Sequence, residues 1–375
     1  MLTHSIRRNT LKRSCYSTSS KIISRPKVLK QSTALSRLDS KTLALASQTP
    51  KWHPPWELYK VIRGHRGTVN AVVVDPSNDF FCSAASDTTV KLWDLASGAL
   101  RHTLTGHSCS VRALAIDSRW PYLFSSGDDK QIFLQDLSIA NNAKVRSFFG
   151  HSSSVNHLAI HPTLNILFSG SGDNTIKAWD IRSPKPITTF VGHQQDIAGL
   201  VCREDSPTLI SSSFDLNIKF WDLKMMTCIK TLTNHSKPPR GLALHPMGNS
   251  FCSGDSEVVK VWDLPRGSLQ GNYRNHVGST ITKLIVNHDD VIVGSTRKGE
   301  LFFWDYQTGH NYQKIDVDFP GCDTSQKSIS DIQFDYSQTR ILAACDDGSI
   351  KMFKVVEDAQ EQEISWIKPK EISFF

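Results

Sequence analysis

The chain has 375 residues, of which 39% are hydrophobic and 21% charged, close to the usage of ordinary globular proteins. No stretch approaches the roughly 18 consecutive apolar residues of a membrane-spanning helix, so we expect a soluble protein with no membrane partner. Residues 1–50 carry ten Lys and Arg against one acid, whereas residues 51–375 carry 33 basic and 35 acidic residues. This distribution excludes a protein that binds nucleic acid over its whole surface, because the net charge of +7 belongs to the tail.

The first segment, residues 1–51, is rich in Ser, Thr, Lys and Arg and poor in aromatic residues, which is typical of a disordered tail. Three functions fit this composition. The tail could contact RNA, with an affinity that falls steeply with salt, or it could direct nuclear import. Residues 1–25 are also rich in Arg and Ser and free of acids, as mitochondrial presequences are.

From residue 56 onward the sequence repeats itself about every 42 residues. Each repeat begins with Gly-His or Asn-His, and Trp-Asp or a close relative follows 27 or 28 residues after the histidine. The first markers are Gly64-His65, Gly106-His107, Gly150-His151, Gly192-His193, Asn234-His235 and Asn275-His276. The second markers are Trp93-Asp94, Gln135-Asp136, Trp179-Asp180, Trp221-Asp222, Trp262-Asp263 and Trp304-Asp305. The pattern resembles the WD40 repeat.

The second repeat illustrates the layout of one unit. Residues 111–116 and 122–126 are expected strands, 128–130 a tight turn, and 131–137 and 144–149 two further strands. Four antiparallel strands per repeat make a propeller blade. With a degenerate seventh unit, the sequence predicts an all-β fold, a seven-bladed WD40 β-propeller.

The seventh unit has expected strands at 329–334, 340–345 and 349–355, with Phe353 at the Trp position and Ser325 at the His position. No fourth strand follows it, because residues 357–363 are acidic and polar. We therefore expect residues 57–63 to complete the last blade, which closes the ring and removes two exposed sheet edges. The expected domains are a basic tail at 1–51, the propeller at 52–356 and a C-terminal tail at 357–375.

Within the repeats, an Asp lies six residues before the Trp position and a Ser lies four residues before that Asp. His, Ser, Asp and Trp can join in one hydrogen-bond network, in which the indole N–H donates and the hydroxyl relays to the imidazole and carboxylate. The expected network residues are His65, Ser83, Asp87, Trp93, His107, Ser125, Asp129, His151, Ser169, Asp173, Trp179, His193, Ser211, Asp215 and Trp221.

Two units depart from this register. In the fifth unit Asp255 comes one position early, and in the sixth unit Lys298 occupies the Asp position, so we expect these blades to be less rigidly networked. The marker histidines are structural in this interpretation, and no catalytic residues are expected, since no paired carboxylates and no glycine-rich phosphate loop occur. A small-molecule substrate is not expected either.

Metal and disulfide sites are also not expected. His157 and His161 have zinc-like spacing for a helix, but on a strand residues four apart lie about 13 Å from each other. The eight cysteines contain no CxxC pair, and we interpret them as small buried hydrophobic residues of a reducing compartment. The sequence therefore predicts no cofactor.

The segment Lys51–His65, KWHPPWELYKVIRGH, is more specific than the repeat and resembles the pleiotropic-regulator family of WD40 pre-mRNA-splicing factors. Further matching stretches are Trp93–Leu100, Pro121–Ser125, Leu232–His235, Asp290–Val293, Trp304–Gln313, and Ser365-Trp366 with Pro369. The resemblance covers about residues 51–370. It implies a non-catalytic scaffold of the activated spliceosome, associated with the nineteen complex, whose partners are other splicing proteins. It also favours the nucleus, with the cytoplasm as a second location, over mitochondria.

The loops after each Gly-His and the turns before each Trp-Asp strand are expected on one face of the propeller. Arg is a common interface anchor, and an exposed Phe can fill a partner pocket. Pro238-Pro239 stiffens the loop that presents Arg240. The alternative for each residue is a solvated loop rim. The candidate partner-binding residues on this face are Arg66, Arg112, Asn156, Gln194, Phe214, Lys237 and Arg240.

A second function is suggested by Trp179-Asp180-Ile181-Arg182, a WDxR motif. It resembles the docking box of WD40 substrate receptors in cullin-type ubiquitin ligases, where Arg182 would contact the adaptor. The alternative is a surface arginine after a strand.

Overall fold

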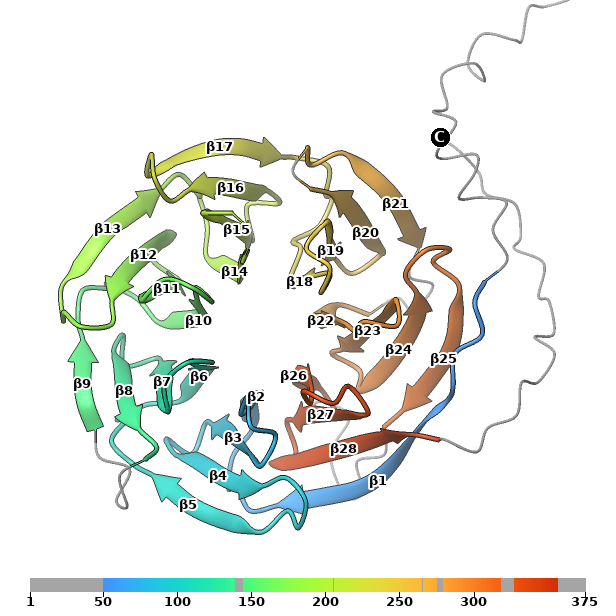
Figure 1. Ribbon diagram of the computed structural model, residues 1–375, viewed down its shortest axis with the longest axis horizontal. Coiled ribbons are helices and arrows are strands. Elements are labelled where there is room, and N and C mark those ends of the chain that lie inside the picture. Colours follow the sequence, from blue (N-terminus) through green and yellow to red (C-terminus); the bar gives the residue numbers. More distant parts are fainter. Residues whose placement is uncertain are drawn as a thin grey trace, which may run out of the picture. The chain divides into compact units, whose positions relative to one another are not determined.

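The computed structural model describes residues 50–138, 144–204, 206–264, 266–274, 279–317 and 327–356. These residues form 28 strands in seven four-stranded antiparallel sheets, arranged around a ring as the blades of a propeller (Figure 1). The prediction of a seven-bladed all-β propeller is confirmed. Within these segments no helix is long and apolar enough to cross a membrane. Residues 1–49 and 357–375, His276 and Ser325 lie outside the described residues.

Blades 1–6 each use four consecutive strands, with the innermost strand first. Blade 1 contains β2 Val69–Val74, β3 Phe80–Ala85, β4 Val90–Asp94 and β5 Leu100–Leu104. Blade 2 contains β6 Val111–Ile116, β7 Tyr122–Gly127, β8 Ile132–Asp136 and β9 Lys144–Phe148. Blade 3 contains β10 Val155–Ile160, β11 Ile166–Ser171, β12 Thr175–Asp180 and β13 Pro186–Val191.

The remaining blades continue around the ring. Blade 4 contains β14 Ile197–Cys202, β15 Thr208–Ser213, β16 Ile218–Asp222 and β17 Thr227–Leu232. Blade 5 contains β18 Gly241–Leu244, β19 Ser250–Gly254, β20 Val258–Asp263 and β21 Leu269–Arg274. Blade 6 contains β22 Ile281–Val286, β23 Val291–Thr296, β24 Glu300–Asp305 and β25 Asn311–Asp316. Blade 7 contains β26 Ile329–Phe334, β27 Arg340–Cys345, β28 Ser349–Val355 and β1 Trp56–Arg63.

The ring closes where both ends of the described chain share blade 7. Strand β1 pairs antiparallel with β28, from Trp56 opposite Val355 to Arg63 opposite Ser349. Figure 1 shows the blue β1 along the outside of the red β28. The prediction that residues 57–63 complete the last blade is confirmed, and the strand begins one residue earlier, at Trp56. The outer edge of β28 is thereby paired, and β1 becomes the outermost strand of blade 7.

The core is divided among the blade interfaces. Seven clusters of buried side chains lie between successive blades, one at each interface around the ring. The cluster between blades 7 and 1, for example, joins Ile62, Phe81, Trp93 and Ile350. Because a single four-stranded sheet cannot bury its own faces, each blade depends on its two neighbours.

The residues before β1 fasten the chain to blade 6 as well. His53 Nε2 lies 3.3 Å from Asp305 Oδ1, and the His53 ring stacks on Tyr312 with 5.1 Å between the ring centroids. The side chain of Gln313 bonds both backbone groups of Trp56, each at 2.8 Å. Residues 53–63 therefore bridge blades 6 and 7, and this contact gives the KWHPPW stretch a structural role.

Candidate functional site

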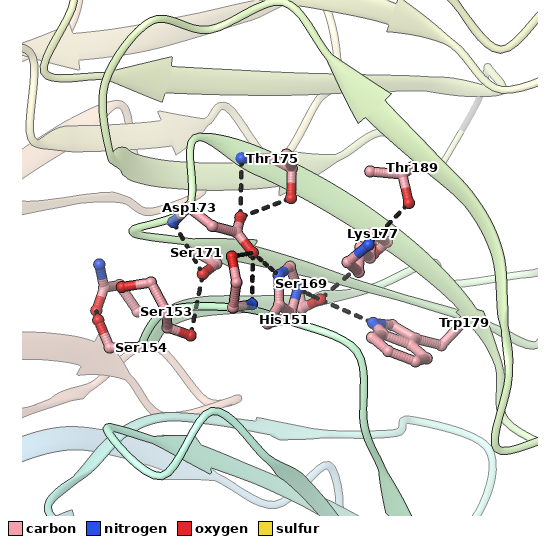
Figure 2. A network of polar contacts seen from close by, with 12 residues as sticks. His151, Ser153, Ser154, Ser169, Ser171, Asp173, Thr175, Lys177, Trp179 and Thr189 are labelled. Carbon is pink, nitrogen blue, oxygen red and sulfur yellow. Dashed lines mark hydrogen bonds and ion pairs between the residues drawn. The ribbon is translucent and has the colours of Figure 1, made fainter.

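Four marker side chains in blade 3 form one hydrogen-bonded chain (Figure 2). Trp179 Nε1 donates to Ser169 Oγ at 2.8 Å, and the same oxygen lies 2.7 Å from His151 Nε2. His151 Nδ1 in turn lies 2.8 Å from Asp173 Oδ2. The hydroxyl thus accepts the indole N–H, and the two ring nitrogens of His151 connect it to the carboxylate of Asp173.

The same hydrogen-bonded chain occurs in two other blades, at residues that the repeat spacing predicts. It joins His65, Ser83, Asp87 and Trp93 in blade 1 and His193, Ser211, Asp215 and Trp221 in blade 4. All six distances lie between 2.7 and 2.9 Å. The structure therefore brings together the expected network residues of blades 1, 3 and 4.

The position of each residue on its strand or loop explains why these sequence spacings bring the four side chains together. The histidine lies in the loop before the innermost strand, the serine on the second strand, and the tryptophan on the third, as in blade 3. The aspartate lies in the turn between the second and third strands, where Asp173 Oδ1 accepts the backbone N–H of Thr175 at 3.0 Å. The residue between them, Asn174, adopts a left-handed φ of 65°, which Asn tolerates better than most residues. One aspartate thus caps the turn and anchors the histidine loop.

Burial sets the protonation states of the network. Burial lowers the pKa of His65 and of His193, and hydrogen bonds from each histidine to its aspartate offset only part of that effect. Burial alone would raise the pKa of Asp87, but hydrogen bonds from Thr89, His65 and the backbone of Arg66 outweigh it and lower the pKa to about 2. At neutral pH these pairs consist of a neutral imidazole and a carboxylate.

We call each hydrogen-bonded His–Ser–Asp–Trp set a tetrad. The distances between its side chains match those of a hydrolase triad, but the surroundings differ. Ser83, Ser169 and Ser211 are fully buried, and each hydroxyl already accepts an indole N–H. A substrate carbonyl has no approach to these oxygens. No group of three metal-ligating side chains that could hold an ion occurs among the described residues.

The expectation of a weaker network in blade 5 was wrong. His235 lies 2.9 Å from Asp255 and 2.7 Å from Ser253, and Trp262 donates to Ser253 at 2.7 Å. The interval from His235 to Ser253 is 18 residues, as in the other tetrads. The missing residue falls in the turn, which shortens without displacing a strand.

Blade 2 lacks the indole. His107 bonds Asp129 and Ser125 at 2.7 and 2.8 Å, and its ring stacks on Phe133 with centroids 4.1 Å apart. Gln135, at the Trp position, is buried with an Oε1 that has no hydrogen-bond partner. The blade therefore keeps three of the four network members.

Blades 6 and 7 use other contacts near the corresponding turns. In blade 6, Thr296 Oγ1 accepts the backbone N–H of Glu300 at 3.1 Å across the turn. In blade 7, Asp347 accepts the backbone N–H of Ser349 at 2.9 Å and lies 3.4 Å from the buried ammonium of Lys351. His276 and Ser325 lie outside the described residues, so no contact of either is assigned.

The candidate partner-binding residues on the histidine-loop face differ in how many ion pairs and hydrogen bonds their side chains already make within the chain. Arg112 pairs with Asp128 through two bonds of 2.9 and 3.0 Å, and Lys237 lies 2.5 Å from Glu257. Asn156 Oδ1 accepts the hydroxyl of Ser154 at 3.2 Å.

The remaining candidate residues on that face make fewer polar contacts through their side chains. Arg66 and Gln194 are exposed, and their backbone N–H groups donate to network aspartates. The guanidinium carbon of Arg240 lies 4.7 Å from the ring centroid of Phe214. The structure thus brings together two candidates that lie 26 positions apart in the sequence.

Arg182 lies at the opposite end of blade 3, after β12. It is exposed and lines a cavity of about 280 Å³ together with Trp120, Val145 and Ile181. The indole of Trp120 is 55% exposed. Sequence reasoning missed the aromatic side of this cavity, because Trp120 falls in a loop without periodicity.

The ring of seven four-stranded blades and the His–Ser–Asp–Trp tetrads define the protein class as a WD-repeat β-propeller. The family model described as "WD domain, G-beta repeat" matches residues 56–94, 98–136, 142–180, 184–222, 226–263 and 313–354.

Individual relatives identify the family within this class. Pre-mRNA-splicing factor PRP46 of Kluyveromyces lactis is 50% identical over 317 residues, 84% of this chain and 73% of the relative. PRP46 of Saccharomyces cerevisiae is 46% identical over 320 residues, 85% and 70% of the two chains. Protein pleiotropic regulator PRL2 of Arabidopsis thaliana is 40% identical over 329 residues, 87% and 68% of the two chains. The chain belongs to the PRP46 and pleiotropic-regulator family of WD40 proteins.

Proposed function

We propose that the chain is a non-catalytic scaffold in pre-mRNA splicing, a component of the activated spliceosome that is associated with the nineteen complex. The observation that carries this proposal is the identity of 40–50% over most of the chain with relatives named as pre-mRNA-splicing factors and a pleiotropic regulator. The tetrads give the proposal a physical basis, because they hold the inter-blade loops in fixed positions for partner proteins.

Affinity purification of the tagged chain from nuclear extract tests the splicing role. We expect other splicing proteins of the nineteen complex and spliceosomal small nuclear RNAs to co-purify, and the tag alone to recover neither. Recovery of neither proteins nor RNAs with the tagged chain would contradict the proposal.

We infer a nuclear location, with the cytoplasm as a second compartment, from the same family membership. The test is imaging of a fluorescent fusion of the full chain beside a fusion that lacks residues 1–50. Nuclear fluorescence of the full chain is expected. A mitochondrial signal that disappears on truncation would instead identify residues 1–25 as a presequence.

The alternative function is substrate receptor of a cullin-type ubiquitin ligase. It is supported by the exposed Arg182 of the WDxR motif, which lies beside the exposed Trp120 on one cavity. Arg182→Ala should then abolish binding to the ligase adaptor in a pull-down with purified proteins. Lys224→Ala is the matched control, because Lys224 follows Trp221-Asp222 at the equivalent position of blade 4. Equal adaptor binding by both variants would exclude docking through Arg182.

A further inference from the structure

One backbone position recurs around the ring on the face of the histidine loops. In six blades, the residue one place beyond the second strand donates its N–H to the carbonyl of the residue just before the innermost strand. The residues at this position are Ser86, Asp128, Gly172, Phe214, Arg297 and Asp346. Blade 5 has a related link in which the N–H of Arg240, just before innermost strand β18, donates to the carbonyl of Gly254, the last residue of β19, at 3.0 Å. Because the innermost strands lie nearest the centre of the ring (Figure 1), this position lies at the inner side of each blade.

Three successive blades contribute side chains beside these backbone links to a group that we name the arginine–phenylalanine patch. It consists of Phe214 of blade 4, Arg240 of blade 5 and Arg297 of blade 6. Arg240 stacks on Phe214 and both are half-buried, whereas Arg297 is exposed. Stacking on an aromatic ring holds a guanidinium in place and leaves its edge donors available.

The two arginines are not neutralised. No ion pair between described residues includes Arg240 or Arg297, whereas Lys283 nearby lies 3.4 Å from Asp331. Burial, followed by the positive charge of Arg297, lowers the pKa of Arg240. Two like charges held close without a carboxylate reduce stability unless a ligand supplies the missing negative charge.

Burial, together with the charges of Lys283 and Arg240, lowers the pKa of His157 on innermost strand β10 to about 3. His157 is therefore uncharged at neutral pH and leaves the positive charge of the site to the two arginines.

The chemistry of the surroundings favours carboxylates of a protein over a nucleic-acid backbone. Asp346 lies in the next blade at the recurring position, and the exposed Asp196 directly precedes β14. A polynucleotide presents a phosphate every few ångströms and needs a continuous basic track, which these acids interrupt. A short acidic segment fits two guanidiniums, each of which can pair with a carboxylate through two parallel hydrogen bonds.

We propose that the arginine–phenylalanine patch binds an acidic segment of a partner protein, with carboxylates on Arg240 and Arg297 and an apolar side chain over Phe214. This inference rests on the proposed scaffold role, since it specifies the chemistry by which one partner binds. It also assigns a function to Arg297, which the sequence pattern does not distinguish from any other turn residue.

Fluorescence anisotropy with the full purified chain tests the proposal. The probe is a fluorescein-labelled peptide of twelve residues with the repeat Glu-Leu-Asp-Gly. We expect Arg240→Gln and Arg297→Gln each to weaken binding at least about tenfold, and Phe214→Ala to weaken it as well. Arg101→Gln is the matched control and should bind as the wild type does, because Arg101 lies on outer strand β5 and Asp94 already pairs with its guanidinium. The basic tail is identical in all variants, so differences between them report the patch.

Two results would overturn the proposal directly. One is equal affinity of the peptide for the wild type and the arginine variants, which includes failure of all of them to bind. The other is arginine-dependent binding of a twelve-nucleotide oligouridylate without such binding of the peptide, which would identify a nucleic-acid site.

Thermal melting separates a binding patch from a structural one. Arg297→Gln removes a like charge and should not lower the melting temperature; a clear decrease together with lost binding would overturn the proposal. The scaffold role can fail independently. If peptide binding depends on the arginines but no splicing proteins are recovered from extract, the binding patch is supported and the splicing role is contradicted. If splicing proteins are recovered but peptide binding does not depend on the arginines, only the binding patch is contradicted.

Discussion

A single serine hydroxyl connects each tetrad. In blade 4, Ser211 Oγ is fully buried, accepts from Trp221 at 2.8 Å and lies 2.8 Å from His193. Its removal leaves a buried indole N–H without an acceptor and the imidazole without a donor. We expect Ser211→Ala to lower the free energy of unfolding by about 1–3 kcal/mol, measured by urea denaturation.

Blade 2 offers the matched control for that prediction. Ser125 is equally buried and lies 2.8 Å from His107, but no indole donates to it, because Gln135 replaces the tryptophan. Ser125→Ala therefore leaves one group without its partner where Ser211→Ala leaves two, and it should cost less. An equal or larger cost for Ser125→Ala would contradict the role assigned to the hydroxyl relay.

The neutral histidines make the fold sensitive to acid. Since burial lowers the pKa of His65 and His193 in the folded chain, the unfolded chain binds more protons once the pH falls below about 6.5. The stability contributed by these histidines is complete above that pH and declines as the pH falls toward the folded pKa. The decline reaches up to about 1.4 kcal/mol per pH unit for each histidine. The lowered pKa of Asp87 extends the loss into more acidic solution.

Thermal melting between pH 7.5 and pH 4.5 measures this effect. We expect a flat melting temperature above pH 6.5 and a steady fall below it. His193→Gln removes one of the two titrating groups, so its melting temperature should start lower and fall less steeply. An equally steep fall in the variant would show that other groups cause the acid sensitivity.

Strand β1 and the residues before it join the two ends of the propeller. Trp56 is 3% exposed and packs against Phe303 of blade 6 and Phe334 of blade 7, with ring centroids 5.9 Å away in both cases. Trp56→Ala should lower the free energy of unfolding by about 3–5 kcal/mol, because the cavity opens at the seam of the ring. Hydrogen exchange should then increase first along β28. Leu58→Ala on the same strand is the control, since Leu58 is 43% exposed, and a comparable loss there would contradict the assignment.

Features that repeat could be predicted from the sequence, whereas features that occur once could not. The tetrad spacing recurs in several units, so blade number, closure and the network positions of blades 1, 3 and 4 follow from it. In blade 5, the expected spacing from the tryptophan back to the aspartate and serine fails, because the turn between Ser253 and Trp262 is one residue shorter. The spacing from His235 forward to Ser253 is the usual 18 residues and places the serine correctly. The contact of His53 with Asp305 joins residues 252 positions apart, and the stacking of Arg240 on Phe214 joins two adjacent blades. No periodic signal marks such pairs.

The propeller and the tail divide the physical tasks of the molecule. The seven inter-blade clusters and the shared blade 7 make the described residues between 53 and 356 one closed unit. Residues 51–375, which contain this unit, carry 33 basic and 35 acidic residues and are close to electrically neutral. Nearly all excess positive charge lies in residues 1–50. We therefore expect the propeller to bind proteins through local groups of side chains and the tail to bind polyanions through charge alone.

This division predicts how RNA binding depends on salt. The full chain should bind a twelve-nucleotide oligouridylate, with an affinity that falls about 100-fold between 50 and 200 mM salt if about five phosphates are contacted. The chain without residues 1–50 retains the closed ring but only the near-neutral body, so it should bind at least about tenfold more weakly at 50 mM salt. Filter binding of both proteins at the two salt concentrations is the measurement. Equal affinity of both proteins would place the RNA-binding charge on the propeller and contradict the division.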